Sequence, residues 1–91
     1  MGHWKVINKS QVTGSLKGAA RKTTEFAEVM ALVQNGGIPE GKAIRLSRIP
    51  KLPGKNVAGQ IRYALNKEFQ RQGLQYLAKS HGKNEVDVIH L

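Results

Sequence analysis

Apolar residues recur at helical spacing in residues 57–72. The stripe has a period of four and consists of Val57, Ile61, Leu65 and Phe69. This pattern predicts a helix with one face in the core, and Asn56 and Gly73 are typical of its N-cap and its end. Gly59 weakens such a helix by ~1 kcal/mol relative to Ala, which indicates a close approach of the backbone to the sheet or to a ligand.

A second helix is predicted over residues 24–36. Its apolar positions follow the i, i+3, i+4, i+7 pattern in Phe26, Val29, Met30 and Val33. Thr24 is a suitable N-cap, Glu25 and Glu28 fall in the first turns, and Asn35-Gly36-Gly37 supplies a left-handed stop. This helix carries acids and no base, so we expect it to lie away from any bound polyanion.

The remaining apolar residues alternate with polar ones, as in strands. Residues 43–49 place Ile44 and Leu46 on one side, with Arg45 and Ser47 on the other. Residues 74–80 and 85–91 predict a hairpin around His81-Gly-Lys-Asn84. Its open face would hold Glu85 and Asp87 together with Arg45 and Lys79, in weak cross-strand ion pairs. Residues 3–8 could add a short strand, with Trp4 packing on the core.

The order (β)-α-β-α-β-β predicts one domain over residues 1–91, of the α/β (α+β) class. Right-handed crossovers would place both helices on one face of a mixed three- or four-stranded sheet, in a two-layer sandwich. The order is similar to that of Alba-type chromatin proteins and the C-terminal domain of bacterial translation initiation factor three. This resemblance implies a frame compatible with nucleic-acid binding, and it carries no site residues. A sheet edge at residues 43–49 or 85–91 could pair into a homodimer.

Charge is the strongest signal in the composition. The 91 residues include 15 Lys and Arg against 6 Asp and Glu, a net charge of +9. A surface of this kind attracts polyanions, although it can also serve solubility alone. Between Lys42 and Gly73 the only acid is Glu68, and the segment holds eight basic residues: Lys42, Arg45, Arg48, Lys51, Lys55, Arg62, Lys67 and Arg71.

The strand, loop and helix start within this segment predict a phosphate-contacting surface. Lys51 and Lys55 precede a helix N-terminus, whose amides favour anions, and Pro50 and Pro53 stiffen the loop. Residues 9–23 predict a flexible basic loop or arm. The candidate nucleic-acid-binding residues are Arg45, Arg48, Lys51, Lys55, Asn56, Arg62 and Lys67, with Lys17, Arg21 and Lys22 in the arm. About five phosphate contacts would give a salt slope of roughly −4 to −5 on duplex DNA.

Two functions therefore remain open. The first is a non-enzymatic nucleic-acid-binding protein that contacts mainly the phosphate backbone, of DNA or RNA. The second is a small interaction or inhibitor protein that docks on an acidic surface of a protein partner, such as a nucleic-acid-processing complex. A membrane-surface role for residues 57–72 is disfavoured because the core needs the same apolar stripe. No apolar run approaches the ~18 residues of a membrane span, and we expect an intracellular protein of the cytoplasm or nucleoid.

Catalytic and metal chemistry find little support. The chain has no cysteine and one aspartate, and its three histidines, His3, His81 and His90, lack ligand spacing. We expect His81 to be a solvent-exposed turn residue. Residues 36–43 resemble a phosphate-binding loop, but Ala43 replaces the hydroxyl residue and a strand follows instead of a helix. We therefore expect no enzyme activity, no metal and no cofactor.

Overall fold

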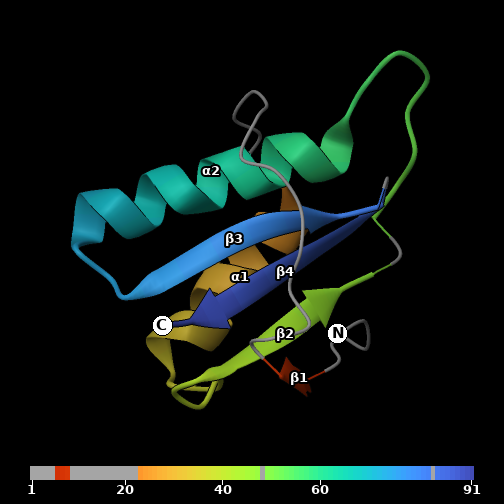
Figure 1. Cartoon of the computed structure of the whole chain (residues 1–91). Coiled ribbons are helices and arrows are strands. Elements are labelled where there is room, and N and C mark those ends of the chain that lie inside the picture. The colour runs from red at the N-terminus through yellow and green to blue at the C-terminus, as the bar shows by residue number, and fades with distance from the viewer. Residues whose placement is uncertain (1–5, 9–22, 48, 83) are drawn as a thin grey trace.

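Six elements make up the fold in the computed structural model, which describes residues 6–8, 23–47, 49–82 and 84–91 (Figure 1). They are β1 (Val6–Asn8), α1 (Thr24–Gln34), β2 (Lys42–Leu46), α2 (Val57–Gln72), β3 (Tyr76–His81) and β4 (Glu85–His90). This confirms the predicted α+β class and element order. The predicted arm at 9–23 and the placement of Trp4 fall outside the described residues, apart from Thr23.

The four strands form one sheet in the order β1-β2-β4-β3. All three pairings are antiparallel, whereas a mixed sheet was predicted. The reason is that β4 inserts between β2 and β3. Those two strands run in the same direction, as a crossover through α2 requires, but they are not neighbours.

This strand order also corrects the predicted sheet edges. Residues 43–49 and 85–91 were expected to offer an edge for a homodimer, yet β2 and β4 are the two inner strands. β4 pairs with β2 on one side and β3 on the other, and β2 pairs with β4 and, at residues 42–44, with β1, so neither is an edge strand. The edges of the described sheet are β1 and β3.

Both helices pack on one face of the sheet, which gives the predicted two-layer arrangement (Figure 1). The strand residues on this face alternate with those on the other, and Ile44, Leu46, Ala78, Val86 and Val88 all join the main core. The predicted helical stripes are confirmed. Val57, Ile61, Leu65 and Phe69 of α2 are buried with Val29, Met30 and Val33 of α1, and Phe26 packs against them.

The opposite face of the sheet holds a smaller apolar cluster. Ile7, Ala43 and Ile89 are buried there, with Leu77 packed against them. Next to this cluster, the register aligns Arg45 of β2 with Asp87 of β4, and Asp87 with Lys79 of β3. The predicted alignment of opposite charges on this face is therefore present, but the pair of Arg45 with Asp87 is not the weak exposed pair that was expected, because the Asp87 side chain is fully buried.

The N-cap of α1 lies one residue earlier in the sequence than predicted. The N-cap is Thr23, whose hydroxyl oxygen accepts from the Phe26 amide at 3.3 Å, and Thr24 is already helical. Two threonines in succession offer the same cap, and the sequence does not choose between them. The predicted stop is confirmed, because Gly36 has φ 69° and the Gly37 amide donates to the Leu32 carbonyl at 2.9 Å.

Helix α2 has the predicted bounds and cap. The Asn56 side-chain oxygen accepts from the Gly59 amide at 3.0 Å, and Gly73 ends the helix with φ 66°. Gly59 was expected to allow close approach of the sheet or a ligand. Its close neighbour is instead the cap itself, because a Cβ at this position would lie 2.5 Å from Asn56 Nδ2. Neither helix in the described ranges is long and apolar enough to cross a bilayer.

Candidate nucleic-acid interface

The loop between β2 and α2 carries the two lysines at the centre of the prediction. It turns at Leu52-Pro53-Gly54-Lys55, where the Lys55 amide donates to the Leu52 carbonyl at 3.0 Å. Pro53 fixes the second position of this turn, and Gly54 has φ 68° at the third, where a type II turn needs a positive angle. The loop is thus closed by its own backbone and ends in the Asn56 cap.

Lys51 and Lys55 are both exposed on this loop, next to the start of α2. The predicted juxtaposition of two cations and a helix N-terminus is therefore present in the structure. Asn56 is exposed beside them and has its predicted capping role, since its side-chain oxygen accepts from the Gly59 amide; its contact with nucleic acid stays a prediction.

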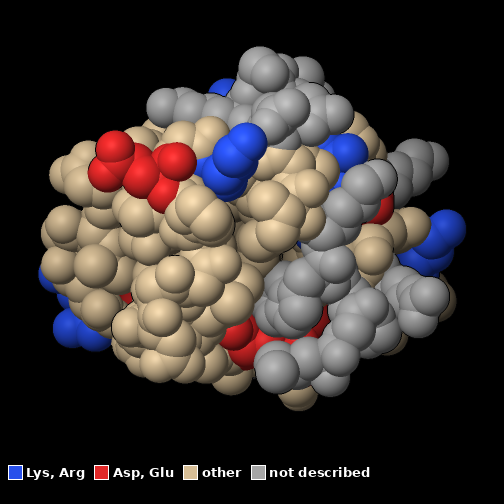
Figure 2. Space-filling model, turned by 90° about the horizontal axis from the view of Figure 1, so that it is seen from below, with Lys and Arg blue, Asp and Glu red and all other residues tan. Residues whose placement is uncertain are grey.

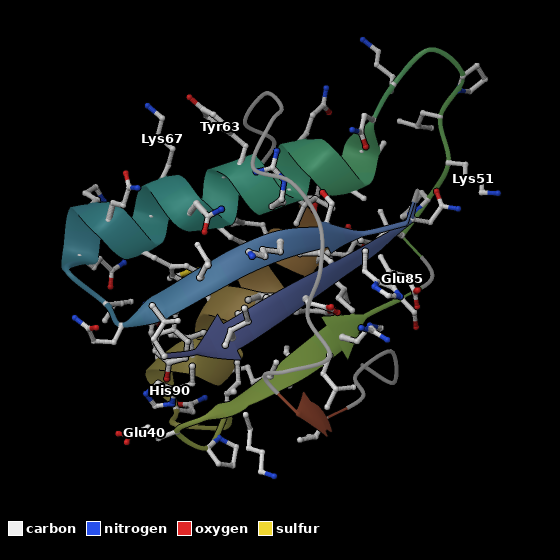
Figure 3. All side chains as sticks on the ribbon, viewed as in Figure 1. Glu40, Lys51, Tyr63, Lys67, Glu85 and His90 are labelled. Carbon is white, nitrogen blue, oxygen red and sulfur yellow. The ribbon has the colours of Figure 1, made fainter. Side chains whose placement is uncertain are left out.

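Lys51 also lines an open pocket of about 470 Å³ beside the β3–β4 turn. His81, Asn84 and Glu85 contribute to the same pocket, and Figure 3 shows Lys51 and Glu85 near the same end of the sheet. The pocket therefore combines a cation with a carboxylate. This reduces its attraction for a polyanion relative to the exposed top of the loop.

Arg45 is not available to a phosphate in this structure. Its Nε donates to Asp87 Oδ1 at 2.7 Å and its Nη2 to Oδ2 at 2.9 Å, and the Asp87 side chain is fully buried. The hydrogen bond to Asp87 raises the pKa of Arg45 above its ordinary value. Arg45 thus neutralises a buried acid, and the prediction that it contacts nucleic acid is not supported by this geometry.

Arg62 was predicted on the exposed face of α2, and this is wrong. Its residue exposure is 1%. Nε donates to Ser80 Oγ at 3.1 Å, which joins α2 to β3. Position 62 lies beside the apolar stripe of α2. Because β3 packs against α2 over a wider area than the stripe, it also buries Arg62.

The outer face of α2 exposes one of the candidate nucleic-acid-binding residues. Lys67 is exposed, with Nζ 5.6 Å from the centre of the Tyr63 ring, and Figure 3 shows both side chains on the same side of the helix. Arg71 forms an ion pair with Glu68 one turn away. Asn66 binds the backbone of Ala78 through both the oxygen and the nitrogen of its side-chain amide, at 2.8 Å each.

The other predicted contacts cannot be placed. Arg48, Lys17, Arg21 and Lys22 lie outside the described residues. They stay predictions from the sequence.

The acids of the described residues are spread over several elements, and one of them, Glu85, lies in the pocket beside this loop. Figure 2, seen from below relative to Figure 1, shows carboxylates in groups and Lys and Arg as isolated side chains among the coloured atoms. Helix α1 carries Glu25 and Glu28 and no basic residue. That α1 lies away from a bound polyanion stays a prediction.

One titratable side chain was misjudged from the sequence. His81 belongs to β3 rather than to the turn and is only partly exposed. Its Nε2 lies 3.8 Å from a Glu85 oxygen and its Nδ1 lies 3.9 Å from an Asp87 oxygen. The strand register places these three residues together, and their spacing in the sequence could not reveal it. Within the described ranges, no three His, Asp or Glu side chains are arranged to hold a metal ion.

Comparisons with known proteins add no further assignment. No protein-family model, curated protein or solved structure matches this chain.

Proposed function

We propose that this protein binds nucleic acid without catalysing a reaction, and that it contacts mainly the phosphate backbone. The observation that carries the proposal is the loop before α2, where Lys51 and Lys55 are exposed on either side of Leu52, Pro53 and Gly54. No acid occurs in the sequence from Lys42 to Lys67. Together with the net charge of +9, this gives a rigid cationic feature on a chain that already attracts polyanions.

The side chains of α2 favour contact with the phosphate backbone over reading of bases. Sequence-specific readout needs arginine or amide side chains that reach base edges. Arg62 is buried, and the Asn66 amide is occupied by Ala78. The exposed lysines suit phosphate oxygens, which position a protein on nucleic acid and carry no direct sequence information.

The first test is a salt series with duplex DNA, single-stranded DNA and structured RNA. The double variant Lys51→Glu, Lys55→Glu should bind duplex DNA of any sequence more weakly than the unaltered protein does. Its slope of log affinity against log salt should be smaller in magnitude by about 2, because each lost phosphate contact removes about 0.9.

A matched control separates the loop from the overall charge. Lys42→Glu removes the same charge as Lys55→Glu, and Lys42 is an exposed residue at the opposite end of β2 from the loop. We expect Lys55→Glu to weaken binding more than Lys42→Glu. Equal effects of the two changes, or a slope near zero in the unaltered protein, would contradict the proposal.

A protein partner is the second candidate function, and Leu52 favours it. This side chain is 39% exposed between the two lysines, and an apolar anchor with a cationic rim suits an acidic protein surface. The two functions differ in a simple measurement. A protein-binding module would leave DNA and RNA unshifted in a gel at low salt and retain a discrete partner, and Leu52→Ala would abolish that retention.

A further inference from the structure

Arg62 is the one buried side chain whose charge has no partner among the described acids. Its Nε bonds to the neutral Ser80 hydroxyl, while its Nη2 is buried and makes no hydrogen bond. Burial lowers the pKa of Arg62 below its ordinary value, but a guanidinium stays protonated at neutral pH. A buried charge without a counter-charge is costly, so its persistence needs an explanation.

A pocket of about 190 Å³ lies where α2 meets β3, and Arg62 is one of the residues that line it. Its lining residues are Arg62, Tyr63, Asn66, Lys67, Gln70 and Leu77. None of these six is acidic, and two are cationic. The two other arginines in the described ranges, Arg45 and Arg71, are each matched to a carboxylate of this chain. The Arg62 pocket is thus a concave site with an unneutralised positive charge.

The polar groups of the pocket differ in their availability. The Asn66 side-chain amide donates one hydrogen bond to Ala78 and accepts one from it, so it serves to fix the wall. Lys67 is exposed, and Figure 3 shows that it extends away from the sheet on the same side of α2 as Tyr63. Lys67 therefore stands at the rim, while Arg62 lies at depth with one nitrogen lacking an acceptor.

We propose that this pocket binds a phosphate group, with Arg62 as the buried donor and Lys67 as the cation at its mouth. The volume is below the 300–1,000 Å³ that is typical of sites for drug-sized ligands, so it suits a small group. The guanidinium fork matches phosphate oxygens, and a charge-assisted bond would satisfy Nη2. A phosphate also neutralises the two cations, which a water molecule cannot do.

The phosphate could belong to a nucleic-acid backbone or to a monoester such as a nucleotide. The proposed function bears only on this choice of source, and the pocket itself is inferred independently of the loop. Binding here differs from contact at Lys51 and Lys55, because it would involve a buried donor and depend less on salt.

The test is a titration with inorganic phosphate, followed by NMR at the Nε–H of Arg62 and the side-chain amide of Asn66. Sodium chloride at the same ionic strength is the control. We expect a saturable shift of the Arg62 signal with phosphate and none with chloride. A linear shift that is equal for both salts would overturn the proposal and would indicate that water alone fills the pocket.

Two variants test the roles of the cations. Arg62→Met should raise the dissociation constant for phosphate about tenfold or more, as expected for loss of a charged hydrogen bond. Because Arg62 also joins α2 to β3, this variant could fail to fold, so Lys67→Gln provides the second readout at an exposed position. Lys67→Gln should weaken phosphate binding about two- to fivefold, while Lys42→Gln, the matched surface control, leaves it unchanged. Equal effects of the two lysine variants would overturn the proposal.

Further arms identify the source of the phosphate. A nucleoside monophosphate and an oligonucleotide without a terminal phosphate are titrated in the same way. A saturable Arg62 shift with the monophosphate alone supports a monoester site, and a shift with both supports contact with the backbone. If the oligonucleotide binds through Lys51 and Lys55 and no phosphate source moves the Arg62 signal, the pocket proposal fails and the proposed function stands. If only phosphate and the monophosphate bind, the pocket stands and the proposed function fails.

Discussion

Three arginines illustrate how the surroundings of a single residue decide its use. Arg45 is held by both oxygens of a buried carboxylate, Arg71 pairs with Glu68 at the surface, and Arg62 is buried with a neutral hydroxyl as its bonded partner. The raised pKa of Arg45 produces no pH dependence near neutrality. Its stabilising contribution is complete below the ordinary arginine pKa and is lost only in strong alkali, as the pH rises through the folded-state value.

Removing Asp87 should expose the cost of the charge it neutralises. Asp87→Ala should lower the free energy of unfolding by about 3 kcal/mol, because it removes the carboxylate that accepts two hydrogen bonds from the largely buried Arg45. Urea denaturation measures this change. Replacing both residues, with Arg45→Met and Asp87→Leu, should recover stability, since an apolar pair can substitute for a buried ion pair. A double variant less stable than Asp87→Ala would refute this account.

Gly59→Ala should lack the stabilising effect that this change has at an ordinary helical glycine. Ala normally stabilises a helix by ~1 kcal/mol relative to Gly. Here the added Cβ would displace the Asn56 side chain, and loss of a cap costs about 1 kcal/mol. Gly59→Ala should therefore give no net gain in thermal or urea stability.

The control for this prediction removes the cap first. In an Asn56→Ala background, Gly59→Ala should stabilise the protein by about the ordinary ~1 kcal/mol. The same gain in both backgrounds would show that the cap and the glycine are independent.

At the scale of the elements, α2 protects an edge of the sheet. Strand β3 lies at that edge, and its Ala78 presents an N–H and a carbonyl to α2. The Asn66 amide binds both groups as a neighbouring strand would. Exposed edges invite pairing with other chains, so this contact also limits self-association.

Asn66→Ala should therefore have two effects. The free energy of unfolding should fall by about 1–3 kcal/mol, because two buried backbone groups lose their partners. Sedimentation should show self-association that the unaltered protein lacks at the same concentration. Gln70→Ala, one turn further along α2 at an exposed position, should change stability by no more than about 0.5 kcal/mol.

The elements also show where reasoning from the sequence succeeds. The stripe, the Asn56 cap and Gly73 determine α2 through local interactions, and they predict its bounds correctly. The insertion of β4 between β2 and β3 depends on contacts between distant residues, which no local pattern encodes. The candidate site likewise has one part that the sequence predicted and one part that it did not. Lys51 and Lys55 were placed correctly on their loop, while the burial of Arg62 and the pairing of Arg45 with Asp87 follow from the tertiary packing.

For the molecule as a whole, the net charge of +9 acts on both stability and binding. Like charges in a compact chain, with a radius of gyration of 11.7 Å, repel one another and destabilise the folded state. Salt screens this repulsion, because the Debye length falls to about 8 Å at physiological ionic strength. The same screening weakens attachment to a polyanion.

Added sodium chloride should therefore raise the free energy of unfolding while it lowers affinity for DNA. Urea denaturation at low and physiological ionic strength measures the first effect. A variant with Lys42, Lys55 and Lys67 changed to Gln should show a smaller rise, since it carries three fewer positive charges. A fall in stability with salt would show that surface ion pairs, such as Arg71 with Glu68, outweigh the repulsion.

The position of β4 at the centre of the sheet has a consequence for biosynthesis. A ribosome delivers β2 and β3 before residues 85–90, and until those residues emerge the two earlier strands have no strand to join them. While β4 is missing the sheet is divided, and the apolar surface that packs against β4 is exposed. Addition of β4 then joins β2 to β3, so completion of the sheet depends on the synthesis of this segment.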